Sequence, residues 1–130
     1  MVELLNPEDL PKPRSYHQVA IATGSRLVFV AGQVAEDVEG NLVGAGDFAR
    51  QARTAFANVG RALAAAGARV DQVARITIYV AGHRAELIPL ISEARDAVFG
   101  DHRPADTLLG VETLAEPGYL IEVEAVAVTD

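Results

Sequence analysis

The last strand-like run of the chain, LIEVEAVAV over residues 120–128, constrains the fold more than any other segment. Successive side chains of a strand point to opposite faces of the sheet. One face of this run therefore carries only apolar residues, and the other carries Glu122 and Glu124 among Leu120, Val126 and Val128. Because apolar side chains occur on both faces, we expect both faces to be covered in the folded protein, which a single layer of helices cannot do.

Two amphipathic helices are predicted to form one of the covering layers. Residues 47–66 have an apolar stripe at helical spacing, with Asp47 as the N-cap and Gly67 as the C-terminal stop. Residues 87–99 form the second helix, which should begin near Glu86 because Pro89 fits only in a first helical turn. The residues expected to face the sheet are Phe48, Ala52, Ala55, Phe56, Val59 and Leu63 in the first helix, and Leu87, Leu90, Ile91, Ala94 and Val98 in the second.

The remaining apolar runs are predicted to be strands of one mixed β-sheet. They cover residues 17–22, 27–31, 73–80, 107–112 and 119–128, after a proline-rich arm that could hold one more strand. Thr23-Gly24-Ser25 is expected to be a hairpin turn between the first two strands, and Gly40-Asn41 and Glu116-Pro117-Gly118 are expected to be turns. The order predicts a single α+β domain over residues 1–130, with two helices packed on the sheet. The simplest cover for the second face is another copy of the chain, so we expect an oligomer.

Composition narrows the classes of partner. The net charge of -7 argues against nucleic acid, because phosphate binding needs a basic surface. No apolar run is long enough for a transmembrane helix, and the N-terminus lacks a signal-peptide pattern, so we expect a cytoplasmic protein without a membrane partner. The chain has no cysteine, and its three histidines have no metal-ligand spacing, so no metal site is expected.

Glu122 and Glu124 are the first candidates for chemistry. Two carboxylates at this spacing lie roughly 6.5–7 Å apart along a strand. Their apolar neighbours could desolvate one of them and raise its pKa, so that it holds a water molecule or transfers a proton. The alternative is a solvent-facing strand with two ordinary acids. Tyr16, after the proline-rich arm, is similarly either a ligand-binding hydroxyl or a structural aromatic residue.

Several stretches, in the right order, resemble the RidA (YjgF/UK114) family of enamine/imine deaminases. Ser15-Tyr16-His17-Gln18 stands where that family has a tyrosine, and Val28 to Gln33 is similar to its "SGQ" strand, with Ala31 in place of the usual serine or threonine. Gln51 to Val59 resembles its "QAxxxxxNV" helix, and Ile121 to Ala125 its "IEIEA" strand. Pro104-Ala105-Asp106-Thr107 matches the segment in which the family has an arginine at the position of Asp106.

The resemblance implies a chorismate-mutase-like fold and a homotrimer that binds a small molecule in clefts between subunits. It implies hydrolysis of reactive 2-imino acids, such as 2-iminobutanoate and 2-iminopropanoate, to 2-keto acids and ammonia, with no cofactor. Glu122 would position or activate the water, Tyr16 would line the cleft, and backbone groups near Ala31 and Gly32 would help to bind the substrate.

Asp106 is the main departure from the family pattern. An arginine there would hold the substrate carboxylate through two charge-assisted hydrogen bonds, whereas an aspartate repels an anion by about 4 kcal/mol at 4 Å and an effective dielectric near 20, before solvent screening. Arg103, or else Arg14, is the nearest candidate for a replacement cation. Two hypotheses follow: an imine or enamine hydrolase in which Asp106 selects a neutral or cationic amine, or a non-catalytic ligand-binding or regulatory trimer. Ribonuclease activity, an older label of the family, is the least favoured because the chain is acidic.

Overall fold

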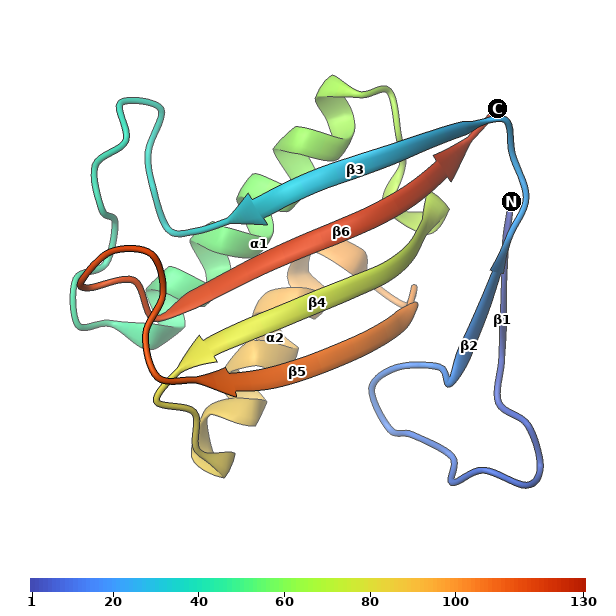
Figure 1. Ribbon diagram of the computed structural model, residues 1–130, viewed down its shortest axis with the longest axis horizontal. Helices are drawn as coiled ribbons and strands as arrows, with labels where there is room; N and C mark the ends of the chain where they lie inside the picture. Colours follow the sequence, from blue (N-terminus) through green and yellow to red (C-terminus); the bar gives the residue numbers. More distant parts are fainter.

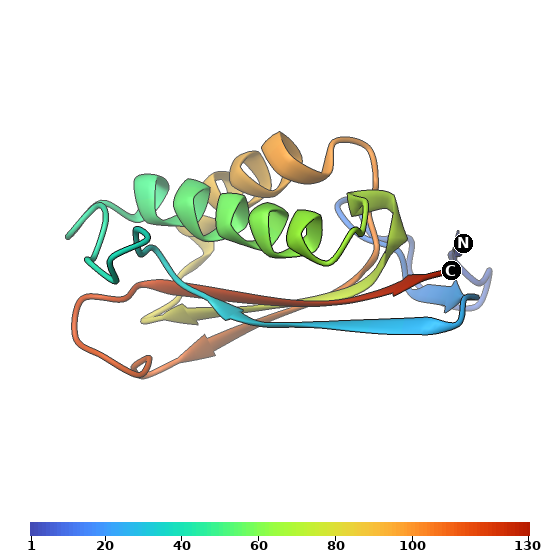
Figure 2. The same ribbon diagram turned by 90° about the horizontal axis from the view of Figure 1, so that it is seen from above.

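A four-stranded sheet and two helices on one of its faces form the two layers of the domain (Figures 1 and 2). The computed structural model describes residues 1–130. The strands are β1 (Val2–Leu5), β2 (Val19–Ala22), β3 (Arg26–Gln33), β4 (Val73–Ala81), β5 (Ala105–Val111) and β6 (Ile121–Thr129), and the helices are α1 (Phe48–Ala65) and α2 (Ile88–Phe99), with short 3-10 turns η1 (Val70–Gln72) and η2 (Ala85–Leu87). The predicted α+β architecture is confirmed.

The main sheet is mixed, and the C-terminal strand lies inside it. The strand order is β3-β6-β4-β5, with β6 antiparallel to both of its neighbours and β4 parallel to β5. β5 and β6 follow each other in sequence, but β4 lies between them (Figure 1). The inner position of β6 agrees with the apolar residues on both of its faces.

The predicted hairpin around Thr23-Gly24-Ser25 is wrong. β2 pairs with β1 in a separate two-stranded sheet, and β3 pairs with β6. At this point the chain crosses from the small sheet to the large one. The N–H of Ser25 donates to the carbonyl of Thr129 (3.0 Å), and a Cβ on Gly24 would lie 2.5 Å from the Val128 side chain. The segment is therefore a glycine-dependent crossing between sheets, and the strand before it begins at Val19 rather than at residue 17.

Both helix predictions are confirmed at their ends. The Asp47 side chain accepts a hydrogen bond from the N–H of Arg50 (3.0 Å), and Gly67 follows the C-cap of α1 with φ +73°. Pro89 lies in the first turn of α2, where its missing N–H leaves no helical hydrogen bond unmade. The inward stripe of α1 is buried from Ala52 to Leu63.

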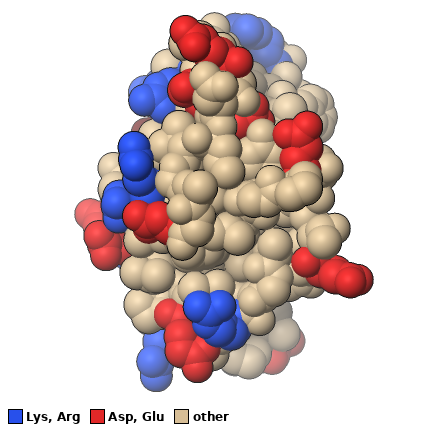
Figure 3. Space-filling view, turned by 90° about the vertical axis from the view of Figure 1, so that its left-hand side faces the viewer, with Lys and Arg blue, Asp and Glu red and all other residues tan.

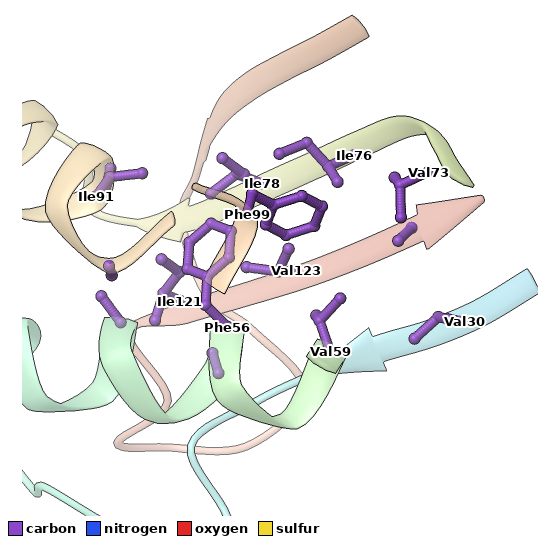
Figure 4. Close-up of a cluster of buried hydrophobic side chains, with 14 of the residues drawn as sticks. Val30, Phe56, Val59, Val73, Ile76, Ile78, Ile91, Phe99, Ile121 and Val123 are labelled. Atoms are coloured by element: carbon purple, nitrogen blue, oxygen red, sulfur yellow. The ribbon is translucent and has the colours of Figure 1, made fainter. Parts of the chain in front are cut away.

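The core lies between the helices and one face of the sheet (Figure 4). Phe56 of α1 and Phe99, the last residue of α2, meet edge to face with ring centres 6.3 Å apart, above Ile78 and Val123 of the sheet. The other side of the sheet, called the open face below, has no helix on it, and Phe29 there is 72% exposed. A single chain therefore buries only one face of its sheet.

Candidate functional site: a charged cavity under helix α2 and an acidic strand on the open face

The predicted site residues divide between the two faces of the sheet. Asp106 is in register with Ile76, whose side chain is buried in the core beneath the helices. Glu122 is in register with Tyr79, on the open face. Residues in register on neighbouring strands point to the same side, so one chain does not bring Asp106 and Glu122 together.

Asp106 opens onto a cavity of about 430 Å³ between α2, β5 and the arm that precedes β2. This space, called the Asp106 cavity below, has apolar walls and a few polar groups, as small-molecule sites commonly have. The lining residues that matter for the chemistry are Tyr16, Ile88, Ile91, Ser92, Arg95 and Asp106.

Two hydrogen bonds place Tyr16 beside Asp106. The N–H of His17 donates to the carbonyl of Pro104 (3.4 Å), and Nδ1 of the same residue donates to the carbonyl of Arg103 (2.6 Å). They attach the arm to the segment that leads into β5. The structure therefore brings together two of the residues selected from the sequence, although 90 positions separate them.

Arg95 is the residue that the sequence analysis missed. Its guanidinium is 4% exposed, and its Nη1 lies 3.6 Å from Oδ2 of Asp106. Its Nε and Nη2 donate to Oδ1 of Asp96, both at 3.2 Å. A signal existed, because Arg95 follows Ile91 by one helical step of four residues and so falls on the inward side of α2. A buried arginine beside a buried aspartate marks a site more strongly than either residue alone.

Arg103, the first candidate for a replacement cation, lies away from the Asp106 cavity within one chain. Its guanidinium binds Asp96 through Nη1 (3.1 Å) and Nη2 (3.4 Å), and it does not line the cavity. Arg14 is exposed and is likewise absent from the cavity wall. The charges instead alternate along a chain from the surface inward, in the order Arg103, Asp96, Arg95, Asp106.

Burial sets the protonation of Asp106. Desolvation raises the pKa of its carboxyl group to about 6, and the charges of Arg95 and Arg75 limit the rise. The group is therefore mainly ionised at neutral pH and gains a proton in mildly acidic solution.

Glu122 lies on the open face against a close-approaching backbone. A Cβ on Gly32 would overlap Oε2 of Glu122, so only glycine leaves room for the carboxylate in this position. The β3–β6 register shifts between Val30 and Gln33, which is a β-bulge at Ala31 and Gly32. The structure thus brings Glu122, Ala31 and Gly32 together at the end of β3.

The two acids of β6 have different surroundings. Glu124 accepts a hydrogen bond from the hydroxyl of Tyr79 (2.6 Å), and this bond raises the pKa of the Tyr79 phenol. Glu122 accepts no hydrogen bond from any group of its own chain, so it remains available to water or a ligand. Gly32 also borders an open cavity of about 660 Å³ between the end of β3 and α1. No three acidic or histidine side chains gather closely enough to hold a metal ion.

The profile of the family described as Endoribonuclease L-PSP matches residues 8–129. The chain belongs to the RidA (YjgF/YER057c/UK114) family. The family resemblance found in the sequence is thereby confirmed. A RutC family protein of Pyrococcus horikoshii is 32% identical over 98% of both chains. A Dermatophagoides farinae protein named 2-iminobutanoate/2-iminopropanoate deaminase is 25% identical over 92% of this chain and 91% of its own.

Solved structures of the RidA family share the fold. A Yersinia pestis Rid family protein of unknown function superposes with a TM-score of 0.91 and 32% identity over 98% of each chain. Escherichia coli TdcF, solved with bound serine, gives a TM-score of 0.70 and 25% identity over 98% of this chain and 99% of its own.

Neither helix of this RidA-family chain has the length and apolarity needed to cross a bilayer. At the end of the molecule where β3 and β4 finish, basic and acidic side chains are interspersed around a broad uncharged area (Figure 3).

Proposed function

We propose that the protein hydrolyses reactive imines or enamines to carbonyl compounds and ammonia, with a substrate preference altered by Asp106. The observation that carries the proposal is the buried Arg95–Asp106 pair in a cavity that also contains Tyr16. Support comes from membership of the RidA family and from a relative named as a 2-iminobutanoate/2-iminopropanoate deaminase.

Glu122 is the catalytic residue in this proposal. Water adds to the imine carbon while Glu122 accepts one of its protons and passes it to the nitrogen, which gives an amino alcohol. Glu122 then transfers the hydroxyl proton to the same nitrogen, the C–N bond breaks, and ammonia leaves a C=O group behind; an enamine first takes a proton on carbon to become the imine. No cofactor is required, because the C=N bond is already activated toward water. The absence of any hydrogen bond to Glu122 within the chain fits this role, since the carboxylate is free to bind the attacking water.

A complete site then needs a second copy of the chain. Asp106 and Tyr16 lie on the helix side of the sheet, and Glu122 lies on the open face. We propose a homotrimer in which the Asp106 cavity of one subunit meets Glu122 of the next, with the small-molecule ligand in the cleft between them. The exposed apolar side chains of the open face, such as Leu27 and Phe29, support such an assembly.

The test is ammonia release from imines produced in the assay by an amino-acid oxidase, which supplies 2-imino acids, and by an amine oxidase, which supplies imines without a carboxylate. We expect the protein to accelerate hydrolysis of at least one class, and Glu122→Gln to lose about 10²–10⁴-fold of that activity. Glu112→Gln, an exposed acid beyond β5, is the matched control. Failure to accelerate any of these imines would contradict the proposal.

The alternative is a non-catalytic ligand-binding or regulatory trimer. It is favoured by the position of the Arg95 guanidinium between the carboxylates of Asp96 and Asp106. In this position the guanidinium is not free to bind a substrate carboxylate as the family arginine would. Turnover that Glu122→Gln abolishes would exclude this alternative.

A further inference from the structure

The Asp106 cavity contains a buried carboxylate with a single, long contact to a cation. The Asp106 side chain is 8% exposed, and its nearest cationic group, Nη1 of Arg95, lies 3.6 Å away, beyond hydrogen-bond distance. Two buried side-chain atoms, Nδ1 of His83 and Oγ1 of Thr129, are fully enclosed and have no hydrogen-bond partner. The Asp106 oxygens are not among such atoms, so they are accessible from the cavity. One long contact leaves most of the hydrogen-bonding capacity of this carboxylate unused, so a ligand that donates an N–H to Asp106 stabilises it.

Arg95, the partner of Asp106 in this ion pair, keeps an N–H group for a further acceptor. The guanidinium of Arg95 uses Nε and Nη2 on Asp96, and Nη1 makes no hydrogen bond. A guanidinium has five N–H donors in a fixed plane, so Nη1 can still donate to an oxygen of a ligand. The cavity therefore presents one acceptor and one donor 3.6 Å apart.

The charges disfavour an anion in this position. Arg95 and ionised Asp106 cancel to zero net charge, and Arg103 and Asp96 behind them cancel in the same way. A carboxylate that enters is attracted by Arg95 and repelled by Asp106 at a similar distance, while it must still lose its water beside Ile88 and Ile91. A neutral carbonyl can accept from Nη1 without that loss.

We propose that the cavity binds an uncharged imine or enamine whose neighbouring carbon carries a neutral carbonyl group, an amide or a ketone, in place of the carboxylate of a 2-imino acid. The N–H of the ligand donates to Asp106, and the carbonyl oxygen accepts from Nη1 of Arg95. This inference rests on the proposed function and specifies its ligand class. Asp106 is the specificity-determining residue, because its charge cancels the attraction that would otherwise hold a carboxylate.

The test compares two stable compounds, pyruvamide and pyruvate, by calorimetric titration at pH 8, where Asp106 is ionised. Pyruvamide has an amide, with an N–H that can donate to Asp106 beside an oxygen that can accept from Arg95, where pyruvate has a carboxylate. We expect pyruvamide to bind at least tenfold more tightly. Asp106→Asn should reduce this preference below threefold, whereas the exposed control Asp101→Asn should leave it unchanged. Equal or tighter binding of pyruvate, no binding of pyruvamide at millimolar concentration, or an unchanged preference in Asp106→Asn would each overturn the inference.

A second variant keeps the test independent of the folding of Asp106→Asn. Arg95→Lys retains the positive charge but lacks Nη1, so it should weaken pyruvamide binding about tenfold; unchanged binding would show that the oxygen does not sit on Arg95. The inference is tested by binding and the proposed function by turnover, so each can be contradicted without the other. A protein that hydrolyses 2-imino acids and prefers pyruvate keeps the proposed function and overturns this inference, and one that prefers pyruvamide but hydrolyses no imine does the reverse.

Discussion

The Asp106 cavity and the Glu122 strand are both acidic sites in apolar surroundings, yet they differ in nearly every physical respect. Asp106 is buried under a helix, faces a guanidinium and has its pKa raised to about 6 by burial. Glu122 lies on the face without helices, against the backbone of Gly32, and accepts no hydrogen bond from the chain. The first arrangement suits recognition of charge, and the second suits handling of water. The fold sets where each carboxylate stands, and the neighbouring groups set what it can do.

Asp106→Arg should have the largest effect, because it places a second guanidinium beside Arg95. We expect a loss of about 3–5 kcal/mol in the free energy of unfolding, as for other buried pairs that lose one partner. The double variant Asp106→Arg/Arg95→Gln should recover most of that loss and hydrolyse small 2-imino acids at least tenfold faster than the wild type. Chemical denaturation and the ammonia assay measure the two quantities. A fully stable single variant would mean that the cavity is wetter than its burial indicates.

The pH dependence of the unfolding free energy should reveal the buried carboxyl group of Asp106. The folded-state pKa of Asp106 is raised to about 6 from an ordinary value of 3.8, so the folded protein holds this proton more tightly than the unfolded chain. The contribution of Asp106 to stability is therefore greatest below pH 4 and falls as the pH rises from about 4 to 6, by up to about 3 kcal/mol.

The measurement is the difference in unfolding free energy between the wild type and Asp106→Asn at pH 4.5 and pH 7.5. The variant should gain on the wild type as the pH rises. Asp101→Asn, on the exposed surface after α2, should keep the wild-type slope. A difference that is constant with pH would contradict the raised pKa of Asp106.

Local signals in the sequence predicted the elements well, but not all of their partners. Both helices follow from an apolar stripe between recognisable caps, which are properties of neighbouring residues. The pairing of β2 with β1, and of β3 with β6, joins segments far apart in the chain. The turn-like Thr23-Gly24-Ser25 shows only that the chain bends there, so the hairpin prediction failed.

The site was predicted in part for the same reason. Glu122 and Tyr16 were candidates from the residue pattern, and the family resemblance added Asp106; the structure places Tyr16 and Asp106 in one cavity. Arg95 was missed because the stripe of α2 was assigned from apolar residues alone, which placed Ala94 inward and ignored its charged neighbour. A buried ion pair has no sequence pattern of its own, since Arg95 and Asp106 belong to different elements.

Gly32→Ala tests how closely the Glu122 strand depends on geometry. The new methyl group would overlap Oε2 of Glu122, whose flexible side chain can move away, so the protein should fold normally. A displacement of about 1 Å in a catalytic group can cost 10²-fold, and we expect a loss of about that size in kcat. Ser25→Ala, at an exposed position just before β3, is the control. Full activity in Gly32→Ala would remove Glu122 from the reaction.

Tyr79→Phe should have the smallest effect of these changes. It tests Glu124, the second acid of β6 on the open face. It removes the hydroxyl that donates to Glu124, a bond of 2.6 Å at a partly exposed position. A small loss in unfolding free energy is expected, because solvent can replace the lost bond. Imine hydrolysis should change less than threefold, because this bond holds Glu124 and leaves Glu122 untouched. If Tyr79→Phe instead lowered kcat as strongly as Glu122→Gln, the catalytic role would extend to Glu124, and the two acids of β6 would act as a pair.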